Sequence, residues 1–384
     1  MANAHTARAM KVVLAIDKFK GSATSAQIAQ TAKQAIKEFD DCIEITIVPV
    51  ADGGDGTVDA IVSLLPEAEI VETAISASVA DMPPRTAKYA MTRSGTAVME
   101  VAEGCGLALV PPDKRNVMMA SSRGCGQLIA DAYRRGARHV VLGLGGSATC
   151  DCAMGLLDAI GFEFCGDDGK RLVPCGENLM RVCHVRKTPL AARMATEMTF
   201  TLLSDVTNPL LGPNGAARVF APQKGASPSD VERLEAGMTN FAQFLPSNIA
   251  TMPVAGAAGG ICAGMAAFLN VTVTSGIDEI LRLADFGHAA QNASLIITGE
   301  GRIDSQTAMG KAPGVILSRG KALGIPVAAI CGQCTHEAMR SLGFDSIVQV
   351  TPPEMPLSTA MRTDVTLRNV HNAVAAIIGQ FCRK

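Results

Sequence analysis

The segment Lys11-Val-Val-Leu-Ala-Ile-Asp17 is a short apolar run that ends on a carboxylate, and the α/β interpretation of the chain starts from it. Such a run predicts a buried strand. The loop Lys18-Phe-Lys-Gly-Ser22 follows, and Thr24 and Gln27 then form a capping-box pattern that predicts the start of a helix. A second strand is predicted over residues 43–50, ahead of a further helix. This alternation predicts parallel strands joined by right-handed crossovers.

The two ends of the chain share this rhythm, whereas the middle departs from it. Near the C-terminus, strands are predicted in alternation with helices over residues 294–298, 326–330 and 346–350. In the middle, residues 86–91 and 97–102 flank the turn-forming Arg93-Ser-Gly95 and predict a hairpin. We therefore predict a discontinuous domain of residues 1–65 plus 290–384, into which residues 66–289 insert as a second α/β domain.

Composition argues against several classes of protein. Hydrophobic residues make up 48% of the 384 residues and aromatic residues only 4%, which predicts an aliphatic core around buried sheets. The net charge of -2 and the lack of a basic stripe argue against nucleic-acid binding. No apolar run reaches about 18 residues, so we expect no membrane span. Twelve cysteines without framework spacing predict free thiols in the cytoplasm.

Six predicted loops at strand ends combine glycines with polar or charged residues, and ligands bind at such ends in parallel sheets. Glycine lets backbone approach a phosphate, carboxylates can hold magnesium or accept a proton, and Lys and Arg neutralise phosphoryl charge. The candidate substrate- and phosphate-binding residues are Asp17, Ser22, Gly53, Gly54, Asp55, Gly145, Gly146, Ser147, Thr149, Asn208, Lys224, Glu300, Arg302, Thr307 and Lys311.

Four of these loops also have a purely structural interpretation. Ser22 could cap a helix while Lys20 is solvated, and Asp205 could start an Asx-turn. The stretch Asp52-Gly-Gly-Asp-Gly56 could be a tight turn, and Gly256–Gly260 could serve close helix packing. From the residues alone, these interpretations stay open beside the functional ones.

A dinucleotide-binding pattern is the main alternative. Gly143, Gly145 and Ala148 match it loosely, with Glu163 as a candidate ribose-binding acid. This alternative is an NAD(P)-dependent reductase of a small hydroxy acid, although the spacing to the acid is shorter than the usual figure of about 20 residues. A non-catalytic anion-binding module is a second alternative. Cys331-Gly-Gln-Cys334 matches a redox motif, but without a second Cys pair it does not suit a zinc site.

In combination and order, these motifs resemble the type I glycerate kinases over nearly the whole chain. The matching segments are Phe19–Ser22, Ala51–Thr57, Gly145–Asp151, Asp205–Leu210, Pro222–Gly225, Gly256–Gly260, Ile297–Asp304, Gln306-Thr307 and Gly310-Lys311. Local departures are Lys18 and Ser305, where the family usually has Ser and Gly. Further departures are Cys150 and Cys152-Ala153, in place of Asn and Gly-Gly.

The resemblance implies two α/β domains, one of them flavodoxin- or Rossmann-like with a largely parallel sheet and the other inserted into it. It also implies ATP-dependent phosphorylation of D-glycerate to 2-phosphoglycerate, with Mg²⁺ as cofactor, in glycerate or glyoxylate catabolism. We expect glycerate and ATP to meet in a cleft between the domains. The sequence does not decide the oligomeric state, for which a homodimer is one option.

The expected catalytic residues are Asp52, Asp205, Asp304 and Lys20. One of the three aspartates would accept the hydroxyl proton, and Asp205 and Asp304 are the candidate magnesium ligands. Lys20, Arg302 or Lys311 would steady the phosphoryl charge or the glycerate carboxylate. The residues alone do not assign these roles individually.

Overall fold

The computed structural model describes residues 10–382, apart from Asp52, Asp55, Pro66, Gln306, Ala308 and Met309. The predicted catalytic residue Asp52 and the predicted binding residue Asp55 thus lie outside the described residues. The chain divides into two compact units: unit 1 is Met1–Ala51 with Ile277–Lys384, and unit 2 is Asp52–Gly276. The domain borders expected from the sequence, after residues 65 and 289, stay a prediction.

Unit 1 is built on a five-stranded parallel sheet with the order β13-β12-β11-β1-β2. Its strands are β1 (Lys11–Ile16), β2 (Glu44–Ile47), β11 (Leu295–Ile303), β12 (Val327–Cys334) and β13 (Ser346–Gln349). When the five strands are renumbered 1 to 5 along the chain within this unit, their order in the sheet is 2-1-3-4-5, as in flavodoxin. The predicted flavodoxin-like α/β fold with a parallel sheet is confirmed.

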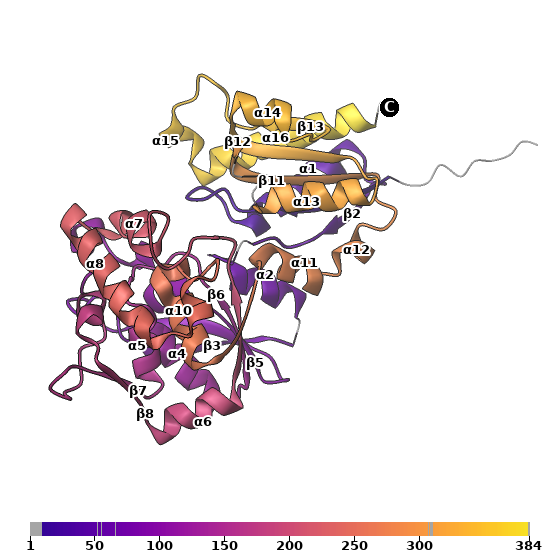
Figure 1. Ribbon diagram of the computed structural model, residues 1–384. Helices are drawn as coiled ribbons and strands as arrows, with labels where there is room; N and C mark the ends of the chain where they lie inside the picture. The colour runs from indigo at the N-terminus through magenta and orange to yellow at the C-terminus, as the bar shows by residue number, and fades with distance from the viewer. Residues whose placement is uncertain are drawn as a thin grey trace, which may run out of the picture. The chain divides into compact units, whose positions relative to one another are not determined.

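Helices cover both faces of this sheet (Figure 1). Leu14 and Ile16 of β1 pack toward one face with α1 and α16, while Val13 and Ala15 pack toward the other with α11, α12 and α13. The predicted capping box at Thr24 is present at the start of α1. The helices are α1 (Ser25–Phe39), α11 (Gly276–Leu283), α12 (Phe286–Ala289), α13 (Ala312–Ala322), α14 (His336–Ser341), α15 (Leu357–Ala360) and α16 (Thr363–Phe381).

Unit 2 contains a six-stranded mixed sheet with the order β10-β9-β6-β5-β4-β3, and a separate β7-β8 hairpin. Strands β5, β6, β9 and β10 are parallel, whereas β3 and β4 are antiparallel. The strands are β3 (Glu69–Ile75), β4 (Arg85–Met91), β5 (Thr96–Glu100), β6 (His139–Gly143), β7 (Phe162–Cys165), β8 (His184–Lys187), β9 (Thr199–Leu203) and β10 (Asn270–Thr274).

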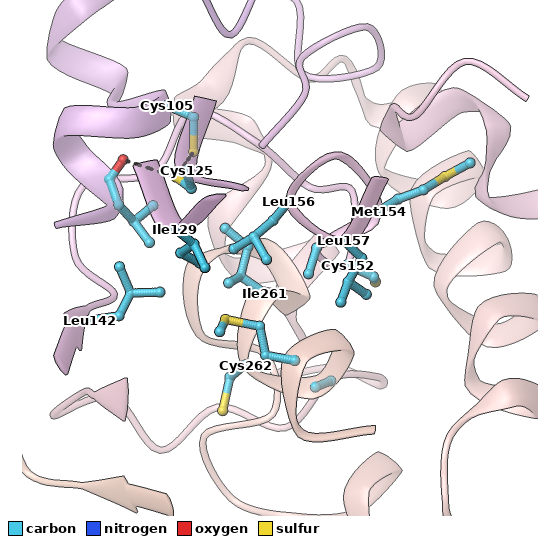
Figure 2. Close-up of a cluster of buried hydrophobic side chains, with 14 of the residues drawn as sticks. Cys105, Cys125, Ile129, Leu142, Cys152, Met154, Leu156, Leu157, Ile261 and Cys262 are labelled. Atoms are coloured by element: carbon cyan, nitrogen blue, oxygen red, sulfur yellow. Dashed lines mark hydrogen bonds between the residues drawn. The ribbon is translucent and has the colours of Figure 1, made fainter. Parts of the chain in front are cut away.

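The helices of unit 2 enclose an aliphatic core that is rich in sulfur (Figure 2). Within it, the thiols of Cys105 and Cys125 lie 3.4 Å apart. The helices are α2 (Thr57–Leu64), α3 (Val101–Cys105), α4 (Arg123–Arg134), α5 (Met154–Ala159), α6 (Pro189–Glu197), α7 (Ala216–Phe220), α8 (Pro228–Phe241), α9 (Ser247–Ala250) and α10 (Ala257–Phe268). Among the helices of the described chain, none combines the length and the apolar character that a membrane crossing needs.

One element is longer than the sequence indicated. The loop predicted from Gly299 onward is strand up to Ile303, because β11 continues to pair with β12, with Glu300 beside Cys331 and Arg302 beside Gln333. Two glycines interrupt the apolar pattern of this stretch, so hydrophobic periodicity does not predict that the strand continues. The side chains at the end of β11 are therefore fixed by a sheet.

Candidate functional site

The centre of the unit 1 sheet has the geometry of a ligand site. Strands β1 and β11 are neighbours, but the chain leaves β1 toward α1 on one face and β11 toward α13 on the other. Ligands bind at the carboxyl ends of strands at such a switch point. Asp17 directly follows β1, is 8% exposed, and donates its backbone N–H to the carbonyl of Gly299 over 2.9 Å.

Two carboxylates, a hydroxyl and an ammonium group gather at the end of β11. Thr307 donates its hydroxyl to Glu300 Oε1 over 2.7 Å and accepts the backbone N–H of Asp304 over 3.1 Å. Lys311 Nζ lies 3.7 Å from Glu300 Oε2 and 3.8 Å from Asp304 Oδ1. The structure thus brings together four of the residues predicted from the sequence, which we call the β11 cluster.

Burial sets the electrostatics of the β11 cluster. It raises the pKa of Glu300 from its ordinary value near 4.5 to about 7, and the negative charges of Asp17 and Asp304 act in the same direction. The hydrogen bond from Thr307 and the charge of Lys311 oppose this shift. Glu300 can therefore take up or release a proton near neutral pH, as an acid-base group of an enzyme must.

The other predicted residues of unit 1 occupy more peripheral positions. Arg302 Nε lies 3.4 Å from Asp304 Oδ2, and its side chain is largely exposed. Lys20 is exposed. The hydroxyl of Ser22 hydrogen-bonds to that of Thr366, so Ser22 also holds its loop against α16 within unit 1.

In unit 2, the loop after β6 packs against the backbone of residues 53–54. Gly145 donates its N–H to the carbonyl of Gly53 over 3.0 Å, and a Cβ at Gly145 would overlap Gly54. A Cβ on Gly53, which has φ +79°, would likewise collide with the carbonyl of Leu203. These predicted glycines therefore serve a close approach of backbone segments.

The same loop surrounds a buried lysine. Lys224 Nζ donates to Ser147 Oγ over 2.8 Å and to the Thr149 carbonyl over 2.6 Å, and the lysine is 3% exposed. Thr149 is fully buried, with its hydroxyl 3.9 Å from the thiol of Cys105. Gly146 turns the loop with φ +76°. Four predicted residues, Gly146, Ser147, Thr149 and Lys224, thus lie in one place.

The backbone explains one departure from the glycerate kinase pattern. Cys152 and Ala153 have φ of +48° and +62°, in the left-handed region that favours glycine. The Gly-Gly that the family usually has here would adopt these angles without strain. Asp151 anchors this turn by accepting hydrogen bonds from Ser122 and from the backbone of Gly155.

Asp205 and Asn208 follow β9, also in unit 2. Asp205 Oδ1 accepts the backbone N–H of Gly276 over 3.0 Å. Asn208 donates its side-chain amide to the carbonyl of Asn214 over 2.9 Å. These two bonds reach backbone 71 and six positions away, so they are not the contact two residues on that defines an Asx-turn, and both side chains are half-buried rather than enclosed.

A further buried carboxylate, which the sequence motifs do not single out, lies at the end of β5. Glu100 ends β5, pairs in register with Gly143 and accepts the backbone N–H of Val58 over 2.8 Å at the start of α2. It is 7% exposed. A signal is present in the sequence, because an acid lies inside the apolar stretch 97–102, but this acid lies within the predicted strand and not in a glycine-bearing loop after it.

The reductase alternative finds no support. Glu163, the candidate ribose-binding acid, lies on β7 of the separate hairpin and pairs with Arg186 at 3.1 Å. The dinucleotide pattern requires its acid within the parallel βαβ unit.

Comparisons with known proteins point to one family. The model of the glycerate kinase family matches residues 12–380. The chain is similar to a glycerate kinase of Bacillus subtilis (35% identity over 91% of this chain and 93% of the relative) and to a glycerate 2-kinase of Escherichia coli (34% identity over 92% and 93%). A crystal structure provisionally described as glycerate kinase 2 of Salmonella typhimurium superposes with a TM-score of 0.81, at 31% identity over 98% of this chain and all of the other. The chain therefore belongs to the glycerate kinase family.

Proposed function

We propose that the chain transfers the γ-phosphoryl group of ATP to a hydroxyl of D-glycerate, with 2-phosphoglycerate as the product, in glycerate or glyoxylate catabolism. The observation that carries this proposal is the β11 cluster at the switch point of a flavodoxin-like sheet. It offers a lysine for phosphoryl charge beside carboxylates that suit a metal ion or a proton. Membership of the glycerate kinase family supports the choice of substrate.

Phosphoryl transfer needs positioning and charge neutralisation more than covalent chemistry. We assign charge neutralisation to Lys311, with Lys20 and Arg302 as further cations, and proton acceptance to Asp52, Asp205 or Asp304. The predicted substrate contacts of Asp17, Ser22 and Asn208, and of the glycines in both units, remain part of the proposal. Glu300, which titrates near neutrality, would follow the charge of the bound phosphates.

Magnesium fits the chemistry of these residues. Mg²⁺ takes one or two protein carboxylates and completes its shell with phosphate oxygens and water. Within the described part of the chain no three metal-ligating side chains form a complete site, which is the usual situation for a metal that arrives with a nucleotide. The candidate ligands are Asp304 in unit 1 and Asp205 in unit 2, and the ion would neutralise charge on the β- and γ-phosphates.

The decisive experiment incubates the purified protein with ATP, Mg²⁺ and D-glycerate and follows ADP release in a coupled assay. Phosphorus NMR of the product distinguishes 2- from 3-phosphoglycerate. L-Glycerate and glycolate serve as substrate controls, and reactions without glycerate measure background ATP hydrolysis. We expect ADP release only with D-glycerate and a single 2-phosphoglycerate resonance. Absence of any glycerate-dependent ADP would refute the proposal.

The cysteines support a cytoplasmic location. All twelve are free, and eight of these are buried. Unpaired thiols persist in a reducing compartment, which is also where ATP is available to a metabolic kinase.

A further inference from the structure

Lys224 is a buried basic residue that has no carboxylate partner among the residues that the structure describes. The residue ends a short 3-10 turn and is 3% exposed, and no ion pair joins it to any carboxylate of the described residues. Its hydrogen bonds to oxygen go to two neutral groups, Ser147 Oγ and the carbonyl of Thr149, and its ammonium group also interacts with the buried thiol of Cys150. A buried cation of this kind is costly unless an anion compensates it.

The direction of the hydrogen bond to Ser147 determines what that serine can do. An ammonium group only donates, so Ser147 Oγ accepts from Lys224 and its own proton points elsewhere. Among the described residues, none accepts that proton. Ser147 is 6% exposed, so its hydroxyl is held almost entirely within the protein.

The loop around Ser147 is held rigidly. The carbonyl of Gly146 accepts the N–H of Leu107 over 2.7 Å, and the N–H of Ala148 donates to the carbonyl of Cys105 over 2.8 Å. Gly106 and Ser147 form an isolated bridge between these two bonds. The backbone on both sides of Ser147 is thereby fixed. The hydrogen bond from Lys224 then determines how the Ser147 hydroxyl is oriented.

We infer that Ser147 and Lys224 form a phosphoryl-binding site in which Ser147 donates its hydroxyl to a phosphoryl oxygen and Lys224 acts through it as a positioning residue. The inference rests on the proposed function and deepens it. Lys224 supplies the positive charge without leaving the interior, and it fixes Ser147 as a donor toward the ligand. This differs from the direct phosphate contact that the sequence suggested for Lys224.

Binding and turnover measurements on Ser147→Ala and Lys224→Met test this site. Each variant is titrated separately with ATP and with inorganic phosphate, by calorimetry or by the ligand-induced shift of the unfolding temperature, and kcat and KM are measured for ATP and D-glycerate. Loss of a hydrogen bond to a charged group should weaken ATP binding about 10- to 100-fold in Ser147→Ala. The ligand-free unfolding temperature of Ser147→Ala should also fall, because the buried ammonium group of Lys224 loses one of its acceptors, so the loss of ligand binding is judged from the titrations.

Asn240→Ala is the matched structural control. Asn240 also donates to two acceptors, the carbonyls of Leu179 and Val182, but it has no place in the proposed site. We expect Asn240→Ala to lower the unfolding temperature and to leave both KM values unchanged. Lys224→Met should raise the KM for ATP as Ser147→Ala does, and should also lower stability. If Lys224→Met fails to fold, Ser147→Ala still decides the matter.

The outcomes separate the two proposals. The site is refuted if Ser147→Ala binds ATP and phosphate as the unchanged protein does, or if only the KM for glycerate rises. If the unchanged protein shows no glycerate-dependent turnover, the proposed function fails. In that case the phosphoryl site stands only if ATP or phosphate raises the unfolding temperature of the unchanged protein and does not raise that of Ser147→Ala.

Discussion

Thr307 and Glu300 are joined by a hydrogen bond of 2.7 Å in which a fully buried hydroxyl donates to a carboxylate oxygen. The same hydroxyl accepts the backbone N–H of Asp304, so it links the end of β11 to the turn that follows. Lys311 faces the other oxygen of Glu300 at 3.7 Å. Burial is the main cause of the raised pKa of Glu300, and these contacts adjust that pKa and can each be changed separately.

Glu300→Gln should change how stability depends on pH. Because the folded protein raises the pKa of Glu300 from near 4.5 to about 7, the stabilisation is full below pH 4.5 and is lost as the pH rises through 7. The free energy of unfolding of the unchanged protein should then fall, relative to Glu300→Gln, by about 3 kcal/mol between pH 4.5 and pH 8. Urea denaturation at several pH values measures this difference. A constant difference across the range would contradict it.

Thr307→Val should move that transition to higher pH. Valine keeps the shape but cannot donate, so ionised Glu300 loses the hydrogen bond that lowers its pKa. A bond to a charged group corresponds to a shift of about one pH unit or more. Thr307→Ser retains the donor and is the matched control, for which we expect no such shift. In each background, the free energy of unfolding is measured at several pH values with and without Glu300→Gln. The pH at the midpoint of the change in this difference reports the pKa of Glu300.

Lys311→Met should reduce turnover far more than stability. Its ammonium group is partly exposed and pairs with Glu300 and Asp304 only at 3.7 and 3.8 Å, so the fold depends little on it. In the proposed reaction the same charge stabilises the transferring phosphoryl group, and we expect kcat to fall about 100-fold or more. Lys33→Met, at an exposed position of α1, is the control and should retain full activity. Equal activity of the two variants would exclude a catalytic role for Lys311.

Gly259→Ala and Ala258→Gly should have opposite effects on stability. A Cβ at Gly259, which has φ +70°, would overlap the carbonyl oxygen of Thr149 and lie 2.8 Å from Cys150 Cα. We expect a loss of about 2–4 kcal/mol. Ala258 has φ +55°, in the left-handed region that favours glycine. Glycine there should relieve this strain and raise the free energy of unfolding by about 0.5–1 kcal/mol. Thermal unfolding measures both; stabilisation by Gly259→Ala would contradict the packing described here.

Local patterns were enough for the elements with strong periodicity. The capping box at Thr24, the strand that ends before Asp17 and the parallel alternation at both ends of the chain are all properties of neighbouring residues, and each is present in the structure. The glycine-rich motifs also indicated the family, because their order along the chain is itself a property of the sequence.

The contacts of the individual site residues follow from the packing of segments that are distant in the chain. No local pattern shows that Lys224 is buried beneath Ser147, 77 positions earlier in the chain, or that Glu300 continues a strand because β12 lies beside it. The physical reason is that burial, hydrogen-bond direction and a shifted pKa arise from contacts between distant segments. Residue type and spacing indicate which groups are available, and packing determines which of them remain charged, enclosed or free to donate.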